Sequence, residues 1–463
     1  MPYRLGVDLG TSFTAAAVTD GSEPTVIGLG NRALQIPSVL FLQPDGTFLV
    51  GEAAEQRGLT EPDRLAREFK RRIGDHVPIM VAGAPFSPQA LTAHLLRWVV
   101  DAATERMGQP PSEVVLTHPA NWGPFQLELL DQVAAMAGIT STRRCTEPEA
   151  AAAQYAAQTR VSPGDRIAVY DLGGGTFDAC VLEKTDTGFH ALGTPEGVEH
   201  LGGADFDEAL LRHVLTTLNP TNTPLNPDDP KVTAGLARLR RNCLEAKEAL
   251  STAVDTLVPV ALPGLSTTVR VTRAEFEQMI RPALTETITA ITRALRNAHV
   301  EPAHLHSILL IGGSSHIPLV SQMLNQEFPV PTALHPHPTH DTALGSLRVG
   351  HDEADGSTAT PPAPVTPAAL PPVAAEPAAA TAAAVGPPLA ALGPDGGGAG
   401  GDGTPPPGGE GAAAAGLPGG SPAPAVGAST RPPGGLVRVL AVVVAAVLLG
   451  IGAGVFITQR DKG

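Results

Sequence analysis

Residues 169–178, VYDLGGGTFD, place an aspartate, three glycines and a threonine directly after a β-branched run. Glycine supplies the positive φ angles of tight turns, so one interpretation is a plain β-hairpin. The other is that the backbone passes close to an anion, with Asp171 and Thr176 serving its metal ion and its chemistry. This stretch alone leaves both interpretations open.

A similar stretch, GVDLGTSFTAAAV at residues 6–18, repeats the order of strand, Asp-Leu-Gly, turn and strand. A duplicated hairpin indicates two similar subdomains that face a shared cleft. Two such hairpins can hold a polyphosphate between them with backbone N–H groups. Asp8 and Asp171 would then point at Mg²⁺, which prefers oxygen ligands and keeps several waters. No GxxxxGK[ST] sequence occurs, so a Walker-type loop is excluded.

A third glycine turn follows another apolar run, in SILLIGGSSHIPLV at residues 307–320. Taken alone, this pattern favours a simple strand-to-helix turn. Because it follows the two hairpins in order, we interpret it as the loop on the nucleoside side of the same cleft.

These turns require a scaffold, and strand-like and helix-like runs alternate along residues 1–350. The strand-like runs include RLGVDLG, EVVLTHP, RIAVYDLG and SILLIGG. Helical patterns cover residues 87–108, 124–137, 203–218, 231–253 and 273–299. This alternation predicts an α/β fold.

The composition limits which binding partners and which cellular compartment are expected. A net charge of −15 argues against nucleic acid as the main partner. Cys145, Cys180 and Cys243 fit no zinc-binding spacing, and we expect reduced thiols in the core of a cytosolic domain. The N-terminus lacks the apolar core of a signal peptide, so we expect the first domain to remain in the cytosol.

The character of the chain changes after residue 350. Residues 351–434 are rich in Ala, Pro and Gly and are expected to form a disordered tether. Residues 435–458 are expected to form a transmembrane helix, because 436–457 are apolar except for Arg438. A buried core helix is the alternative. With a short tail at 459–463, we expect a single-pass protein of the cell membrane whose N-terminal domain is cytoplasmic.

Residues 1–350 resemble the ATPase domain of the heat-shock protein 70 chaperones, within the actin and sugar-kinase superfamily. The resemblance rests on eight segments in family order: GVDLGTSFT, FKRRIG, THPANW, TEPEAAA, VYDLGGGTFD, HLGGADFDEAL, EAKEALS and LLIGGSSHIPLV. It implies a duplicated, actin-like (ribonuclease H-like) domain with two lobes around a cleft that binds ATP or ADP with Mg²⁺. The peptide-binding β-sandwich and helical lid of the family have no counterpart after residue 350, so independent foldase activity is not expected.

The resemblance also implies catalytic roles. Lys70 would neutralise charge on the γ-phosphate and hold the attacking water, and Glu147 would orient that water. Asp171 would hold Mg²⁺ through water and accept a proton, and Thr176 would contact phosphate. The alternatives are an exposed helix lysine for Lys70 and an acid favoured by the helix dipole for Glu147. Lysine is scarce, at five of 31 basic residues, which weakens the first alternative.

The remaining implied positions bind the nucleotide and its metal ion. Asp8 would hold Mg²⁺ together with Asp171. The residues that would bind the nucleotide are Asp8, Gly10, Thr11, Ser12, Gly173, Gly174, Gly175, Gly202, Gly203, Lys247, Ser251, Gly312, Gly313, Ser314 and His316.

Four positions depart from the family pattern. On the nucleoside side, Leu244 replaces a ribose-binding glutamate, His316 replaces an arginine that stacks on adenine, and Thr339 replaces a ribose-contacting aspartate, although Asp341 lies two residues away. In the family, a proline and a later arginine relay the nucleotide state. Here the proline is Pro119 and the second position is Leu127. The nucleoside side is therefore expected to bind loosely or differently.

Three functions compete on this basis. The first is a membrane-anchored ATPase that hydrolyses ATP slowly as a conformational switch. The second is a chaperone variant that acts on protein clients through co-chaperones or the tether. The third is a scaffold that binds ATP without hydrolysis and recruits partners through polyproline II. The HPHPTH run, with His335, His337 and His340, is interpreted as a surface loop, with metal binding as the alternative.

Overall fold

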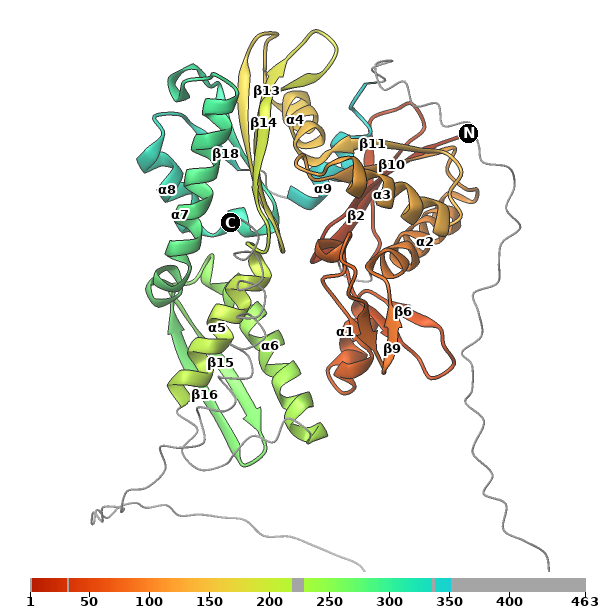
Figure 1. The fold of residues 1–463 in the computed structure, drawn as a ribbon, viewed down its shortest axis with the longest axis vertical. Coiled ribbons are helices and arrows are strands. Elements are labelled where there is room, and N and C mark those ends of the chain that lie inside the picture. Colours follow the sequence, from red (N-terminus) through yellow and green to blue (C-terminus); the bar gives the residue numbers. More distant parts are fainter. Residues whose placement is uncertain (1, 31–32, 219–228, 335–337, 351–463) are drawn as a thin grey trace, which may run out of the picture. The chain divides into compact units, whose positions relative to one another are not determined.

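The computed structural model describes residues 2–30, 33–218, 229–334 and 338–350. They belong to one compact unit, Met1–Asp352, in which the chain forms two lobes (Figure 1). The expected tether, transmembrane helix and tail all lie outside the described residues, as do His335 and His337. No helix within the described ranges is long and apolar enough to cross a bilayer.

The first lobe is built on a mixed six-stranded sheet of order β11-β10-β1-β2-β3, in which β4 also pairs with β2. Strands β1 and β2 form the predicted antiparallel hairpin, and β10 and β11 continue the sheet in parallel on the other side of β1. The strands are β1 (Arg4–Leu9), β2 (Phe13–Thr19), β3 (Thr25–Ile27), β4 (Ile36–Pro37), β10 (Glu113–His118) and β11 (Thr142–Thr146).

The second lobe repeats this arrangement in a five-stranded sheet of order β14-β13-β12-β17-β18. Here β12 and β13 form the antiparallel hairpin, and β17 and β18 run parallel beyond β12. The strands are β12 (Arg166–Leu172), β13 (Phe177–Lys184), β14 (Phe189–Val198), β17 (Ser307–Ile311) and β18 (Thr332–Leu334). The shared order and direction confirm the predicted duplication and the α/β class.

The long helices occur where the apolar periodicity predicted them, and their ends are set by local capping. Ser87 caps the first of them by accepting from the Ala90 N–H, and Gly108 ends it in the left-handed region. The helix predicted to reach residue 253 ends at Leu250, because the chain turns before the next strand. These helices are α2 (Pro88–Met107), α3 (Pro124–Met136), α5 (Gly203–Leu218), α6 (Pro230–Leu250) and α7 (Arg273–Asn297).

Smaller elements extend each lobe away from its main sheet. In the first lobe, α1 packs on a three-stranded sheet, and a short hairpin lies nearby. In the second, β15 and β16 form a hairpin that packs against α6. The elements are α1 (Glu52–Gly58), β5 (Leu40–Leu42), β6 (Phe48–Val50), β7 (Leu65–Ala66), β8 (Ile79–Val81), β9 (Ala84–Phe86), β15 (Asp255–Leu262) and β16 (Leu265–Thr272).

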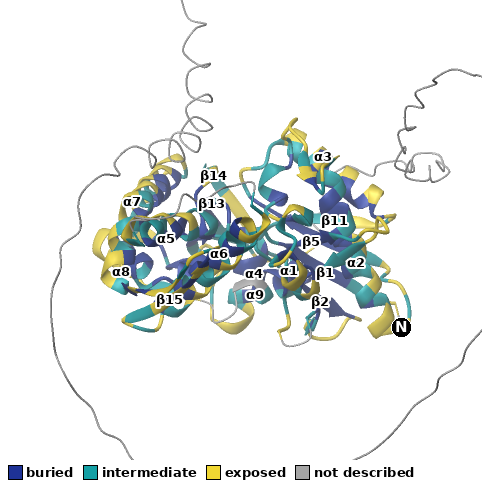
Figure 2. Ribbon diagram, turned by 90° about the horizontal axis from the view of Figure 1, so that it is seen from below, coloured by how far each residue is buried: buried dark blue, intermediate teal, exposed yellow. Residues whose placement is uncertain are grey.

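Two helices join the lobes. Helix α4 (Glu147–Gln158) contacts β10 and β11 of one sheet and β12 and β14 of the other, while α9 (Pro338–Ser346) contacts β1, β2 and β17. The two helices pack closely, since a Cβ atom at Gly345 would overlap the Ala150 carbonyl oxygen. Figure 2 shows the buried residues concentrated in the sheets and in this junction. The cleft is therefore closed at its base by helix packing.

Candidate active site

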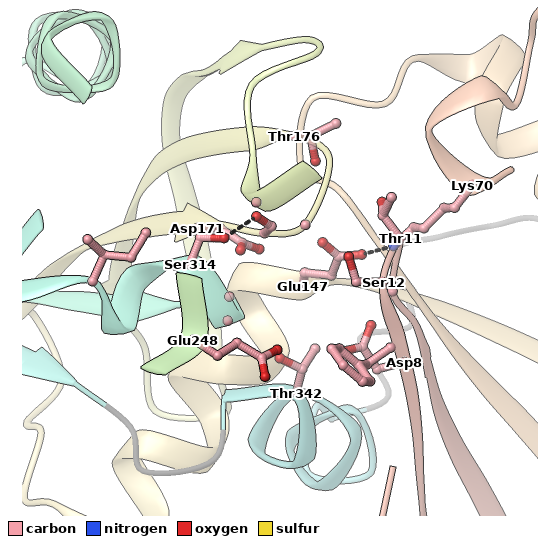
Figure 3. A pocket seen from close by; sticks show the side chains of 18 of the residues that line it. Asp8, Thr11, Ser12, Lys70, Glu147, Asp171, Thr176, Glu248, Ser314 and Thr342 are labelled. Atoms are coloured by element: carbon pink, nitrogen blue, oxygen red, sulfur yellow. Dashed lines mark hydrogen bonds and ion pairs between the residues drawn. The ribbon is translucent and has the colours of Figure 1, made fainter. Parts of the chain in front are cut away.

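An open cavity is lined by residues from both hairpins, the third glycine turn and α6. Figure 3 shows these side chains converging from the two sheets. The predicted site residues that line the cavity are Asp8, Gly10, Thr11, Ser12, Lys70, Glu147, Asp171, Gly173, Gly174, Thr176, Gly203, Lys247, Ser251, Gly312, Gly313 and Ser314. Gly175, Gly202 and His316 were also predicted and do not line it.

The two hairpin turns face each other directly. A Cβ atom at Gly174 would overlap the Ser12 hydroxyl, and one at Gly175 would lie 2.7 Å from the Thr11 methyl carbon. None of Gly173, Gly174 and Gly175 has a φ angle in the left-handed region. Gly174 and Gly175 are therefore needed for the close approach of the two hairpins and not for a turn with positive φ.

The third turn and the start of α5 fix the shape of the phosphate loop. Ser314 Oγ donates to the Gly173 carbonyl oxygen over 2.9 Å, and the Gly203 N–H donates to the same oxygen over 3.0 Å. Gly312 has a φ of 78°, and a Cβ atom there would overlap the Leu172 carbonyl oxygen and approach the Asp171 carboxylate. The glycine at 312 is thus required by both conformation and space.

Lys70 and Glu147 form a buried ion pair at the cavity wall. Lys70 Nζ lies 2.6 Å from Glu147 Oε1, and the two side chains are only 10% and 12% exposed. Lys70 begins the short 3₁₀ turn η2 (Lys70–Arg72), and Glu147 is the first residue of α4, whose N-cap is Thr146. Burial alone would lower the pKa of Lys70, but the carboxylates of Glu147, Asp8 and Asp171 outweigh it and raise that pKa. The ammonium is therefore charged.

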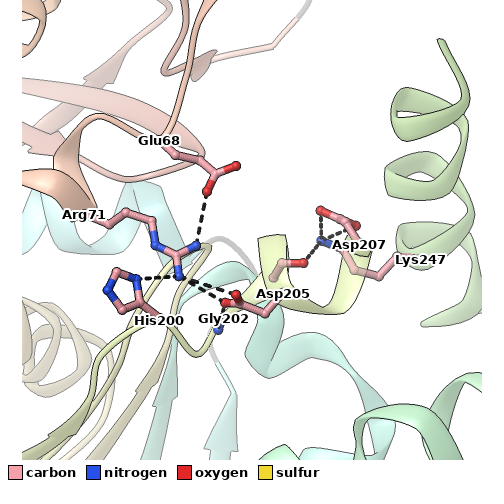
Figure 4. A network of polar contacts seen from close by, with 8 residues as sticks. Glu68, Arg71, His200, Gly202, Asp205, Asp207 and Lys247 are labelled. Atoms are coloured by element: carbon pink, nitrogen blue, oxygen red, sulfur yellow. Dashed lines mark hydrogen bonds and ion pairs between the residues drawn. The ribbon is translucent and has the colours of Figure 1, made fainter. Parts of the chain in front are cut away.

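Arg71, next to Lys70, connects the two lobes. Its guanidinium lies 3.4 Å from the Asp205 carboxylate and 3.1 Å from His200 Nδ1 in the second lobe, and it also pairs with Glu68 at 3.1 Å (Figure 4). Asp205 in turn accepts from the Gly202 N–H over 2.9 Å, at the loop that packs against the phosphate turn. Sequence reasoning did not single out Arg71, although it lies within the FKRRIG segment.

Lys247 reaches the cavity from α6 but is engaged within its own lobe. Its Nζ lies 3.0 Å from Asp207 Oδ2 and donates to the Gly203 carbonyl oxygen over 3.1 Å (Figure 4). Four further lining residues were missed by the sequence prediction: Phe13, Glu248, Ile317 and Thr342. Glu248 was detectable, because it follows Lys247 on the helix that had been placed at the nucleoside.

A model of the family described as Hsp70 protein matches residues 4–82 and 74–345. These ranges take in every element that lines the cavity. The chain belongs to the Hsp70 family. Domains of this family are ATPases that use ATP or ADP with Mg²⁺.

The carboxylates of this Hsp70-family chain fit a hard divalent cation. Burial, followed by repulsion from Glu147, raises the pKa of Asp8 and of Asp178 to about 7, and burial likewise raises the pKa of Asp171 well above its usual range. Lys70 lowers the pKa of all three carboxyl groups, but burial and the neighbouring carboxylates outweigh it, so negative charge is in excess there. The described residues form no group of three direct metal ligands. The excess of carboxylate charge suits Mg²⁺, which prefers oxygen ligands.

Leu244 and His316, two of the departures from the family pattern, do not line the cavity. Leu244 is half-buried and does not line the cavity, and neither does the buried Asp341. The side chain of Thr339 lies outside what the structure describes. Thr342, three residues further along α9, lines the cavity.

Proposed function

We propose that this chain hydrolyses ATP slowly as a conformational switch and is tethered to the cell membrane through residues 435–458. The observation that most strongly supports ATP hydrolysis is the buried Lys70–Glu147 ion pair. It lies in a cavity between two glycine hairpins that face each other. Phosphoryl transfer to water requires positioning and charge stabilisation above all, and these groups supply both.

Each residue has a role that its position supports. Lys70 stabilises negative charge on the transferred phosphoryl group, because its ammonium is held charged within the cavity. Glu147 orients the attacking water, and Asp171, whose pKa is raised by burial, accepts a proton from it. Backbone N–H groups of the hairpins around Gly10 and Gly174 hold the phosphates. When bound, Mg²⁺ neutralises phosphate charge beside Asp8 and Asp171.

The switch is supported by ion pairs that connect the lobes. Arg71 contacts Asp205 and His200 from one lobe, and Arg241 on α6 forms an ion pair with Glu55 on α1 of the other. A nucleotide that draws the two hairpins together would change these contacts, and so change the surface offered to protein clients or co-chaperones.

Membrane attachment rests on the apolar sequence of residues 436–457, with the ATPase domain on the cytoplasmic side. An anchored switch would act on partners at the inner face of the membrane. Its clients and co-chaperones would therefore be proteins that reach that surface.

Hydrogen exchange of the full-length chain tests the switch. With Mg²⁺ present, ATP and ADP should give different protection in α1, α6 and the segment around Arg71. A chain that binds and hydrolyses ATP with identical protection in both states would contradict the switch. Tight ATP binding without any turnover would instead favour the non-hydrolysing scaffold.

A further inference from the structure

A second cavity lies on the second lobe and shares no lining residue with the cavity between the hairpins. It is bounded by α5, by the loop that follows β14 and by the middle of α7, and we call it the α5–α7 groove. Its floor is apolar: Phe206 and Ile280 are buried, while Ala209, Met279 and Ala283 are half-buried. Apolar side chains that solvent still reaches are thus gathered in a hollow of the surface.

The rim of the α5–α7 groove is acidic. Glu286 lies seven positions after Met279 on α7, so both residues are on the face of the helix that lines the groove. Glu199 borders the groove from the loop after β14, and both glutamates are exposed. In the described part of the chain, neither carboxylate forms a hydrogen bond or an ion pair, and no lysine or arginine lines the groove. The groove therefore carries negative charge that no basic side chain of its lining neutralises.

The α5–α7 groove also reaches the contact between the lobes. Asp205 and His200 line it, and both contact the Arg71 guanidinium of the first lobe, over 3.4 and 3.1 Å (Figure 4). His200 has a φ of 57°, a conformation that is costly for a residue other than glycine and that is concentrated at binding and switch regions. A cation bound beside Asp205 would compete with Arg71 for that carboxylate. Occupancy of the groove and closure of the lobes are therefore expected to influence each other.

We infer that the α5–α7 groove is a docking site for a basic, amphipathic segment of a partner protein. Apolar side chains of the segment pack on the floor, where the flexible Met279 adapts to their shape. Its lysine or arginine side chains pair with Glu199 and Glu286, and the same two carboxylates repel an acidic segment. The docking itself does not rest on the proposed function, because it needs no nucleotide, whereas the competition with Arg71 rests on the proposed switch.

Fluorescence anisotropy of a labelled LRLLRL peptide with the full-length chain tests the docking site. This peptide carries two arginines among apolar residues, and LELLEL and SRSSRS are its acidic and polar counterparts. LRLLRL should bind more tightly than either of them. Glu199→Gln combined with Glu286→Gln should weaken its binding about two- to thirtyfold, the scale of two exposed ion pairs. Glu105→Gln combined with Glu128→Gln, at exposed positions of α2 and α3 outside the groove, removes the same charge and should leave the affinity unchanged.

The outcomes separate this inference from the proposed function. Equal affinity for LRLLRL and LELLEL, or unchanged affinity in the variant at Glu199 and Glu286, would overturn the role of the acidic rim. Binding of SRSSRS as tight as that of LRLLRL would overturn the role of the apolar floor. Saturating LRLLRL should also accelerate release of a fluorescent nucleotide, because it displaces Arg71 from Asp205. Unchanged release would refute that competition and leave the docking site standing. A chain that binds LRLLRL in this charge-dependent way but binds no nucleotide would contradict the proposed function alone.

Discussion

Lys70 and Glu147 lie 77 positions apart in the chain, yet Lys70 Nζ donates to Glu147 Oε1 over 2.6 Å inside the cleft. The contact joins a 3₁₀ turn of the first lobe to the first residue of a helix that also packs on the second lobe. The Lys70 ammonium is thus held by the helix that connects the lobes. Its position is therefore linked to the arrangement of the lobes.

Glu147→Gln should lower the rate of ATP hydrolysis about 10²-fold or more, because the water loses its orienting carboxylate. Nucleotide affinity should change little, since Asp8 and Asp171 still neutralise Lys70. Single-turnover hydrolysis and equilibrium binding of the same preparations measure the two effects. Glu149→Gln is an unsuitable control, because Glu149 completes the capping box of α4 with Thr146. Glu105→Gln is suitable, and hydrolysis by Glu147→Gln at the Glu105→Gln rate would contradict the role.

Gly174→Ala should weaken nucleotide binding and destabilise the protein by about 1–3 kcal/mol, because its Cβ atom overlaps the Ser12 side chain. Adding Ser12→Gly to the same chain should recover part of the stability, since the overlapping atoms are removed. Gly188→Ala is a matched control, as a Cβ atom there meets nothing within 4 Å. Thermal unfolding measures the stability of the wild type, the two single glycine variants and the double variant. Equal effects of the changes at 174 and 188 would show that the hairpins do not approach as described.

Glu55→Gln should accelerate release of a bound nucleotide by about 1.4- to fivefold, because the ion pair with Arg241 connects α1 to α6 across the cleft. The size follows from the roughly 0.2–1 kcal/mol of a partly exposed ion pair. Stopped-flow displacement of a fluorescent nucleotide gives the rate. The control is Asp101→Asn, which breaks an ion pair with Arg97 inside α2. If nucleotide release is unchanged in Glu55→Gln, the ion pair does not control opening of the cleft.

The three cysteines should be inert in the native protein. Burial raises the pKa of Cys145 and of Cys243 to about 12 and that of Cys180 well above its usual range, so thiolate is scarce at pH 8. A disulfide reagent should react rapidly with no thiol in the folded chain. After unfolding, it should react with all three thiols. The thiol pKa values in the folded chain exceed the ordinary value of about 8.5. The contribution of the buried thiols to folding stability should therefore fall as the pH rises from about 8.5 towards 12. Rapid native labelling would contradict the described burial.

The repeated Asp-Leu-Gly turns were predictable because a hairpin is local, and its residues are neighbours in sequence. The same is true of helices such as α2, whose cap at Ser87 and end at Gly108 are visible in the sequence. The sequence predicted that the two hairpins face a shared cleft, but it did not predict the contact between Gly174 and Ser12. The reason for the glycines, close approach without positive φ, required the structure.

Other features depend on tertiary packing and left little trace in the sequence. Arg71 meets Asp205 from 134 positions away, and Thr342 reaches the cavity because α9 packs against α4. No pattern near either residue indicates its partner. Glu248 lies between Lys247 and Ser251 on the same helix, but the family pattern that marks those two residues does not mark Glu248. Lys70 was placed through the family resemblance, since a lysine in a short turn carries no local signal of its own.

The most direct test of the ATPase is single-turnover hydrolysis of ATP by the full-length chain and by its Lys70→Ala variant, with Lys231→Ala, an exposed lysine at the start of α6, as the control. The wild type and Lys231→Ala should hydrolyse bound ATP at equal rates. Lys70→Ala should bind ATP but hydrolyse it about 10²–10³-fold more slowly, the usual effect of removing one group that stabilises charge in the transition state. Hydrolysis by Lys70→Ala at the wild-type rate would contradict the account.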